Sequence, residues 1–285
     1  MIVRTLEEAL INGRNYLKEK NIADYDLDAW FLMAYYFKID RMKYFIDPKK
    51  IISLEDYEAY IKLIKQRASK IPLQHITGEQ EFMGLSFLVS KDVLIPRQDT
   101  EILVEEVLKV STGKEILDIC TGSGCIIISL SKLGDIKKGI GVDISKDALK
   151  IANQNKIRLE AEVSFIQSDL FEEVEGKYDI IVSNPPYIAT HEIKNLSDEV
   201  KLHDPFIALD GKEDGLFFYR RIIESLSEYL NVDGRVFFEI GYDQGESVSN
   251  LLRENGYSEI EVIKDLAGLD RVVKATYVNY AEHFT

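Results

Sequence analysis

The chain has 285 residues, of which 46% are hydrophobic and 29% are charged, so it can bury a large core and disorder is not expected. Its formal net charge of −14 counts against a nucleic acid as a direct partner, because basic side chains supply much of the affinity for phosphates. The sequence contains no apolar run of the ~18 residues that a membrane span needs, so none is expected.

Two further features concern the compartment. The first residues turn acidic at Glu7 and Glu8 and lack the apolar run of a signal peptide. Cys120 and Cys125 are too few for a disulfide framework or a zinc site. We therefore expect no bound metal and a cytoplasmic protein.

Residues 1–72 predict a small helical domain with an aromatic core. Thr5 and Glu8 have the spacing of a capping box at a helix start. A second helix is predicted over about 26–37, and a third begins at Ser53. This part carries 13 Lys/Arg and 11 Asp/Glu, whereas the rest carries 22 and 38, so the acidic excess lies in the second part.

Residues 73–98 are predicted to be a linker that contains a β-hairpin. The hairpin is indicated by the segment Phe82 to Phe87, in which two short apolar runs flank a turn. Asp99 or Thr100 is expected to cap the helix that follows. A larger catalytic domain is predicted over 99–285.

From residue 115 onward, short apolar strands alternate with helices such as 146–157 and 216–230. This alternation predicts an α/β domain with a parallel sheet covered on both faces. The loop before the last strand is too short for a crossover helix, so the last two strands should pair antiparallel. The predicted strands are 116–119, 140–142, 163–166, 180–182, 236–240, 260–263 and 271–275.

A glycine loop joins the first of these strands to a helix. Such a loop lets a ligand approach the backbone, and the helix N-terminus offers free N–H donors. Ile127 stands where a dinucleotide fingerprint needs Gly or Ala, so a smaller zwitterion such as a methionine moiety fits better than a pyrophosphate. The loop residues that we assign to a cofactor are Cys120, Thr121, Gly122, Ser123 and Gly124.

Two carboxylates follow the next two strands. Asp143 lies 21 residues after Gly122, at a strand end where a carboxylate can accept hydrogen bonds from both ribose hydroxyls. Asp169 follows the third strand. Because ligands bind beyond the carboxyl ends of parallel strands, both residues are expected to join the glycine loop in one site.

The most specific motif is Asn184-Pro185-Pro186-Tyr187, directly after the fourth strand. Two successive prolines make a stiff turn with no backbone donors. The Asn184 side-chain oxygen and the Pro185 carbonyl can accept the two hydrogens of a planar –NH₂ group, and the Tyr187 ring can stack on its face. This motif resembles the signature of methyltransferases that modify the exocyclic amine of adenine or cytosine, or the amide of glutamine.

Further stretches resemble the release factor glutamine methyltransferase family, and the resemblance covers nearly the whole chain. They are Pro72 to Gly78, Glu81 to Gly84, Leu94 to Glu101, Asp204-Pro205 with Ala208-Leu209, Glu213 to Leu216, Glu239 to Gly241 with Gln244, and Lys264 to Gly268 with Asp270-Arg271. The resemblance implies a seven-stranded, Rossmann-like class I methyltransferase sheet with a small N-terminal helical domain that recognises the substrate. It also implies methyl transfer from S-adenosyl-L-methionine, leaving S-adenosyl-L-homocysteine, to the Gly-Gly-Gln glutamine of class-1 peptide chain release factors.

The family's functional residues can be carried onto this sequence position by position. The glycine loop and Asp143 would hold the cofactor, with Asn184 also touching it. Asn184, Pro185 and Tyr187 would act in catalysis. The adenine would lie among Asp169, Leu170 and Phe171, and the substrate glutamine among Asn184, Pro185, Pro186 and Tyr187.

Two positions depart from the family pattern. Cys120 stands where the family usually has Gly, and it is small enough to keep the loop if its φ is negative. His75 stands where Tyr is common, and a structural role is expected for it. Arg97 and Glu101 either brace the floor of the active site or pair with each other.

Three other functions compete with this one. A nucleic-acid amine methyltransferase shares the Asn184 to Tyr187 turn but needs a basic groove, which the acidic catalytic part does not offer. A glutamine methyltransferase of a ribosomal protein shares the motif and remains a close alternative. A cofactor-binding regulator without catalysis would not need the turn.

Overall fold

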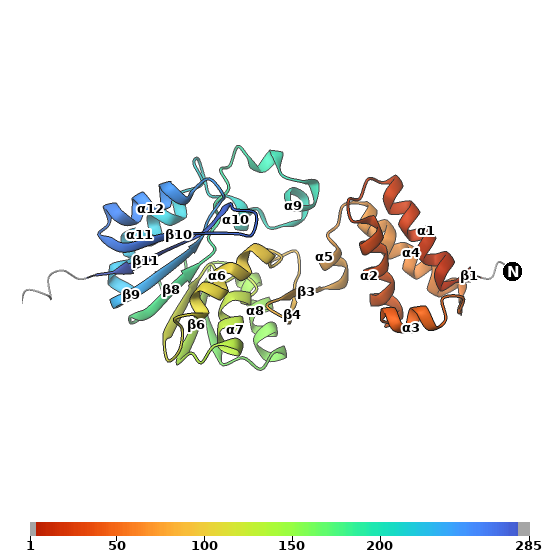
Figure 1. Ribbon diagram of the computed structural model, residues 1–285, viewed down its shortest axis with the longest axis horizontal. Coiled ribbons are helices and arrows are strands. Elements are labelled where there is room, and N and C mark those ends of the chain that lie inside the picture. The colour runs from red at the N-terminus through yellow and green to blue at the C-terminus, as the bar shows by residue number, and fades with distance from the viewer. Residues whose placement is uncertain (1–3, 279–285) are drawn as a thin grey trace, which may run out of the picture. The chain divides into compact units, whose positions relative to one another are not determined.

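The computed structural model describes residues 4–278, and the chain divides into two compact units (Figure 1). The first unit comprises Met1–Glu79 together with Ser197–His203, and the second comprises Gln80–Leu196 together with Asp204–Thr285. The boundary near residue 80 lies beyond the predicted end of the helical domain at residue 72. The distant segment Ser197–His203 carries no sequence signal that assigns it to the first unit.

The first unit is helical, as the sequence predicts. Thr5 and Glu8 form the capping box at the start of its first helix, and Ser53 caps a later one. The apolar sides of the three longest helices enclose one core that includes Trp30 and Tyr60. The elements are β1 (Arg4–Thr5), α1 (Leu6–Glu19), α2 (Tyr25–Phe37), α3 (Arg41–Ile46), β2 (Ile51–Ile52), α4 (Leu54–Ala68), α5 (Leu73–Thr77) and α9 (Asp198–His203).

A buried arginine ties three of these helices together. The Arg67 side chain on α4 donates to Asp28 on α2 at 2.6 Å and to Glu199 on α9 at 2.7 Å. A buried charge is tolerated only when it is paired, so Arg67 needs both carboxylates. This pairing explains why Ser197–His203 belongs with the first unit although it lies far away in the sequence.

The second unit is built on a mixed sheet with the strand order β10-β11-β9-β8-β5-β6-β7 among the described residues. The alternation of strands and helices therefore predicted the fold correctly. The last two strands pair antiparallel, as expected. The strands are β5 (Glu115–Ile119), β6 (Lys138–Asp143), β7 (Val163–Gln167), β8 (Tyr178–Ser183), β9 (Leu230–Glu239), β10 (Tyr257–Lys264) and β11 (Asp270–Tyr277).

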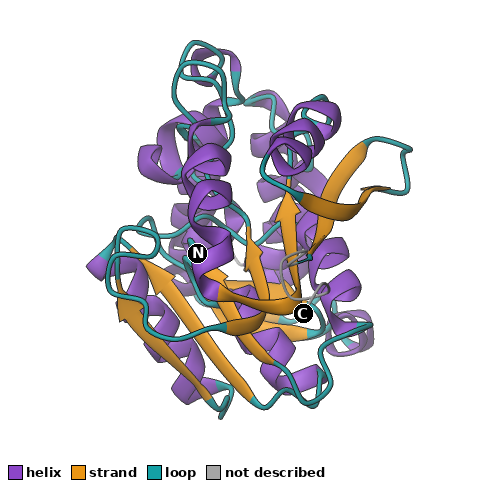
Figure 2. Ribbon diagram, turned by 90° about the vertical axis from the view of Figure 1, so that its left-hand side faces the viewer, coloured by secondary structure: helices purple, strands orange, loops and turns teal. Residues whose placement is uncertain are grey.

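Helices cover both faces of this sheet (Figure 2). Successive residues of a strand alternate between the two cores, so Ile180 and Val182 of β8 face one core while Ile181 faces the other. The helices α6 and α7 pack on the first of these faces, and α11 and α12 pack on the second. The helices are α6 (Gln98–Leu108), α7 (Cys125–Leu133), α8 (Lys146–Arg158), α10 (Phe206–Leu209), α11 (Phe217–Tyr229) and α12 (Gly245–Glu254), with a 3₁₀ turn at Ile193–Asn195.

The predicted hairpin is present as β3 (Glu79–Phe82) and β4 (Leu85–Leu88), with Met83 and Gly84 at the turn. The predicted cap of the next helix was wrong. Helix α6 begins at Gln98 after Arg97, and no side chain caps it. Asp99 and Thr100 lie in its first turn instead, which frees the Thr100 hydroxyl for another partner.

A buried asparagine connects the hairpin to helix α8 and to the glycine loop. Asn155 on α8 is fully buried and makes three hydrogen bonds. Its side-chain oxygen accepts from the Leu88 N–H at 2.6 Å, and its nitrogen donates to the carbonyls of Leu88 and Ser123 at 3.0 Å each. Because Ser123 belongs to the glycine loop, Asn155 links that loop to both β4 and α8.

Replacing Asn155 by alanine should lower the free energy of unfolding by about 2–4 kcal/mol, because three backbone groups lose a buried partner. Asn153→Ala is the matched control, since Asn153 is exposed on the same helix and bonds only to the Leu149 carbonyl. The control should change stability by about 0.5 kcal/mol or less. Urea unfolding of both variants measures the difference, and equal effects would contradict the role of Asn155.

Candidate active site

The site forms where the chain order of the sheet reverses, between β5 and β8. These two strands pair in parallel, with Ile119 opposite Ser183. The Ser183 hydroxyl donates to the Ile119 carbonyl at 2.6 Å, which fixes the two strand ends against each other. The glycine loop leaves β5 and the Asn184 turn leaves β8 at this point, which is where open α/β sheets bind ligands.

A buried carboxyl supports the glycine loop from below. Asp118, the fourth residue of β5, is fully buried, and the Thr121 hydroxyl donates to it. Burial raises the pKa of Asp118 to about 7, although the Thr121 hydrogen bond works in the opposite direction. No motif points to Asp118, because nothing in the sequence distinguishes a supporting carboxyl from one that faces a ligand.

Several residues of the glycine loop have a left-handed backbone conformation. Gly122 and Gly124 have φ values of 55° and 78°, in the left-handed region that suits glycine. Cys120 also has a positive φ, 62°, so the condition of a negative φ is not met, and the loop keeps its conformation with Cys120 in the left-handed region. The loop therefore keeps the conformation suited to glycine and places a side chain there at a steric cost. The thiol is half-buried, and burial keeps its pKa well above the usual value.

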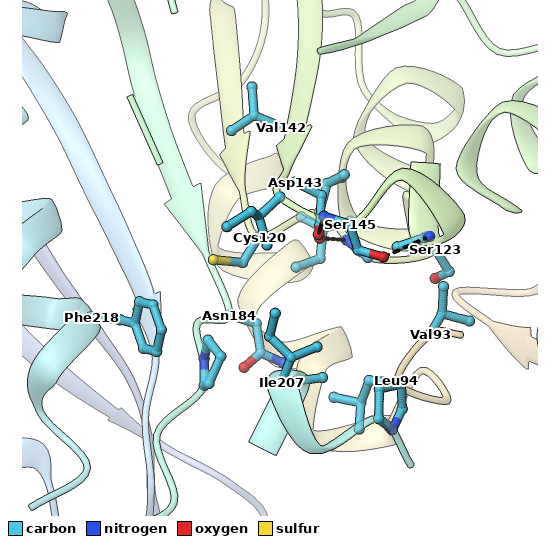
Figure 3. A pocket seen from close by; sticks show the side chains of 18 of the residues that line it. Val93, Leu94, Cys120, Ser123, Val142, Asp143, Ser145, Asn184, Ile207 and Phe218 are labelled. Carbon is cyan, nitrogen blue, oxygen red and sulfur yellow. Dashed lines mark hydrogen bonds between the residues drawn. The ribbon is translucent and has the colours of Figure 1, made fainter. Parts of the chain in front are cut away.

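Asp143 holds the loop as well as facing the pocket. Its two oxygens accept hydrogen bonds from the backbone N–H groups of Gly122 and Ser145, each at 2.9 Å. These contacts join the end of β6 to the glycine loop (Figure 3). Burial raises the pKa of Asp143, while the backbone donors lower it. Each carboxylate oxygen still has a second lone pair for a ligand hydroxyl.

The segment after β7 borders the same pocket. Asp169 accepts a hydrogen bond from Arg221 of α11 at 2.9 Å, and Leu170 lines the pocket. Phe171 turns into the core instead, where its ring stacks on Tyr229 with the centroids 4.4 Å apart. No sequence motif predicts the contact between Arg221 and Asp169, because Arg221 lies 52 residues further along the chain, on α11.

These elements enclose a pocket of about 330 Å³ in the second unit, within the size range of small-molecule sites. Figure 3 shows Cys120, Asp143 and Asn184 around it. Gly124, Phe171, Pro185 and Tyr187 do not line it. The predicted residues that do are Cys120, Thr121, Gly122, Ser123, Asp143, Asp169, Leu170, Asn184 and Pro186.

The proline turn has a side that faces the pocket and a side that faces the protein. Asn184 and Pro186 line the pocket, and the Asn184 amide nitrogen donates to the Thr100 hydroxyl at 3.4 Å. Tyr187 packs against the core, and its hydroxyl lies 3.5 Å from a carboxylate oxygen of Glu239. The Tyr187 carbonyl accepts from the Gln244 side chain at 3.0 Å.

Arg97 and Glu101 do not pair with each other. Arg97 binds Asp204 at 2.6 Å, and Glu101 accepts from the Met83 backbone N–H at 2.5 Å. Arg97 also lines the pocket, so the Asp204-Pro205 segment is fixed beside the site. The sequence placed these residues in the right region but could not assign their partners, which are far apart in the chain.

Among the described residues, no helix has the length and apolar character that a membrane crossing requires.

The residues matched by two family models cover much of the chain. Residues 8–78 match the PrmC N-terminal domain, and residues 97–202 match the methyltransferase small domain. A crystal structure of a methyltransferase from Pyrococcus furiosus superposes with a TM-score of 0.54 at 18% identity, covering 69% of this chain and 90% of that one. The fold and these matches define a class I methyltransferase.

Similar proteins identify the family. A release factor glutamine methyltransferase of Clostridium botulinum is 44% identical over 95% of this chain and 98% of its own length. Its counterpart in Geobacter sulfurreducens is 39% identical over 94% of this chain and 95% of its own length. The chain belongs to the release factor glutamine methyltransferase family, as the sequence motifs indicated.

The left-handed conformation of Cys120 leads to a prediction for stability. Cys120→Gly should change the free energy of unfolding by about 1 kcal/mol or less, because relief of strain offsets the added freedom of the unfolded chain. Cys120→Val should cost about 1–3 kcal/mol, since a β-branched residue fits poorly at positive φ. Thermal unfolding measures both.

Cys125→Val is the control, because Cys125 is buried but opens the right-handed helix α7. A valine there should cost less than a valine at position 120. Equal tolerance of valine at both positions would contradict the strain argument.

Proposed function

We propose that the protein transfers a methyl group from S-adenosyl-L-methionine to the side-chain amide nitrogen of the glutamine in the Gly-Gly-Gln motif of class-1 peptide chain release factors. The observation that carries this proposal is the position of the Asn184 turn. It lies beside the glycine loop at the reversal of strand order, so a planar amide and a cofactor methyl group can share one pocket. A partner that works at the ribosome would place the reaction in the cytoplasm.

The residues around the pocket fit the cofactor. A Cβ on Gly122 would meet no protein atom within 4 Å, so the space beside this backbone is open to a ligand. Asp143 would accept hydrogen bonds from the ribose hydroxyls, and Asp169 with Leu170 would border the adenine. When bound, S-adenosyl-L-methionine supplies an activated methyl group on a positively charged sulfur.

The protein's own part in the reaction is to hold the amide. An amide nitrogen is a poor nucleophile because its lone pair is delocalised. Hydrogen bonds from its N–H groups to the Asn184 side chain and the Pro185 carbonyl would orient the nitrogen and favour build-up of charge on it. Correct placement of two reactants contributes up to about 7–11 kcal/mol in favourable systems. The methylated nitrogen becomes acidic, and its proton can leave to solvent.

Charge favours a protein substrate over a nucleic acid. The part of the chain that forms the pocket, residues 73–285, contains 38 acidic and 22 basic residues, so a polyanion would be repelled. A loop with two glycines beside the glutamine also suits a narrow entrance, because glycine has no side chain to obstruct it. The N-terminal helical domain would add contacts with the partner away from the chemistry.

Incubation with labelled cofactor should methylate a purified class-1 release factor and leave unmethylated the same factor with its loop glutamine changed to glutamate, because the carboxylate has no –NH₂ group. Mass spectrometry of the product locates the methyl group. A candidate ribosomal protein and duplex DNA serve as the competing substrates.

The substrates that become methylated decide between the proposed function and its alternatives. Incorporation into DNA, or equal incorporation into both forms of the release factor, would overturn the proposal. Preference for the ribosomal protein would keep the chemistry and change the partner.

Asp143 and Asn184 should separate cofactor binding from transfer. Asp143→Ala should weaken cofactor binding by about 1.5–3 kcal/mol, the usual cost of losing hydrogen bonds to a charged group. Asn184→Ala should lower kcat far more than it lowers cofactor affinity. Calorimetric titration and steady-state kinetics measure the two effects.

Asp143→Asn is the companion variant, since it keeps one acceptor for the backbone N–H groups of Gly122 and Ser145. It distinguishes a lost ligand contact from a disordered loop. Unchanged affinity in both Asp143 variants would remove this residue from the cofactor site. A kcat within a few-fold of wild type in Asn184→Ala would remove Asn184 from the amide site.

A further inference from the structure

The proposed reaction leaves one buried carboxyl without a role. Glu239, the last residue of β9, is 2% exposed and does not line the pocket. It lies on the protein side of the proline turn, where one carboxylate oxygen is 3.5 Å from the Tyr187 hydroxyl and the other has no hydrogen-bond partner among the described residues. A carboxyl buried this deeply is costly unless it is hydrogen-bonded, so its position calls for an explanation.

Thr100 connects this carboxyl to the active site. It is 2% exposed, lies in the first turn of α6 and lines the pocket. Its hydroxyl accepts from the Asn184 amide nitrogen at 3.4 Å, and the same side chain lies close enough to the Glu239 carboxyl to lower the pKa of that group. The three side chains therefore form a line from β9 through α6 to the proline turn.

The chemistry of the groups fixes the direction of these bonds. An ionised carboxylate can only accept, so the Thr100 hydroxyl can bond to Glu239 only by turning its single proton toward it. The hydroxyl then offers only lone pairs to Asn184, which must present its –NH₂ group to Thr100. The side-chain oxygen of Asn184 then points away from Thr100. This oxygen is the acceptor that a substrate –NH₂ group needs.

We propose that Glu239 and Thr100 are positioning residues that set the orientation of the Asn184 amide, so that its oxygen is available to the substrate nitrogen. The inference rests on the proposed function, because it assigns Asn184 the task of accepting a substrate N–H. It adds two residues that do not take part in the transfer themselves. Neither is recognisable from the proline turn alone, since they come from α6 and β9.

The arrangement depends on the charge of Glu239. Burial, with a smaller contribution from Asp99, raises the pKa of Glu239 to about 7, although Thr100, Arg271 and Tyr187 act in the opposite direction. Below that pKa the carboxyl is protonated and can donate to Thr100. The Thr100 hydroxyl is then free to donate to the Asn184 oxygen, which favours the opposite orientation of the amide. Glu239→Gln removes the charge at every pH and adds an –NH₂ donor beside the remaining carbonyl oxygen.

Three variants and one control test the proposal in the full-length protein. Thr100→Val and Glu239→Gln should each lower kcat about 10- to 100-fold, the effect expected from a misplaced reacting group. Their cofactor affinity should stay within about twofold of wild type, since neither residue is assigned to the cofactor. Thr100→Ser keeps the hydroxyl and should restore most of kcat.

Thr276→Val is the matched control. Thr276 on β11 is 8% exposed, and its hydroxyl donates to Glu259 at 2.8 Å, so it has the same chemistry away from the pocket. Its kcat should equal that of wild type. Thermal unfolding of all variants identifies any that lose activity by unfolding, and Thr100→Ser keeps the test decisive if Thr100→Val does not fold.

The pH dependence gives a readout that a merely structural role would not change. In wild type, kcat should rise with pH through an apparent pKa near 7 as Glu239 ionises, and Glu239→Gln should lack this rise. The side-chain ¹⁵N signal of Asn184 should titrate over the same range without any substrate present and should not titrate in Glu239→Gln.

The outcomes separate this inference from the proposed function. The positioning role alone would be overturned if the wild-type enzyme methylates release factor and Thr100→Val has the same kcat as Thr276→Val. An Asn184 signal that does not titrate would overturn it as well. A wild-type enzyme that leaves release factor unmethylated, with the Asn184 signal titrating as expected, would overturn the substrate assignment and keep the orientation of the amide.

Discussion

The parallel pairing of β5 with β8 is the constraint on which the site depends. Ile119 and Ser183 lie opposite each other and are also joined by a side-chain hydrogen bond. The next residues along each strand, Cys120 and Asn184, therefore leave the sheet side by side although they lie 64 positions apart. A shift of one residue in this register would turn every following side chain to the other face and separate the glycine loop from the proline turn.

Buried carboxyls lie beneath the site, and their nearest partners are hydroxyl and backbone N–H groups. Thr121 donates to Asp118, backbone N–H groups donate to Asp143, and Thr100 and Tyr187 contact Glu239. Burial disfavours the ionisation of these carboxyls, and the pKa of each is raised.

The sequence predicted the parts of the site that lie within single segments. The capping box, the strands, the antiparallel final pair and the family could all be inferred, because each depends on local periodicity or on a motif. The partners of Arg97, Glu101 and Asp169 could not, since each contact joins residues that only folding brings together. The cap of α6 was wrong for a related reason. Thr100 has the residue type of a cap, but tertiary contacts with Asn184 and Glu239 determine where its hydroxyl goes.

The proline turn shows that a motif alone does not distinguish residues that face the pocket from residues that pack against the protein. Asn184 faces the pocket, whereas Tyr187 is held from behind by the protein. A Cβ on Gly211 would lie 2.8 Å from the Tyr187 backbone, and one on Gly215 would lie 2.3 Å from its carbonyl, so only glycine allows this segment to pack so closely. Gln244 bonds to the same carbonyl. Backbone packing thus fixes one end of the turn and β8 fixes the other, so the freedom left at Asn184 is the rotation of its side-chain amide, on which the Thr100 hydroxyl acts.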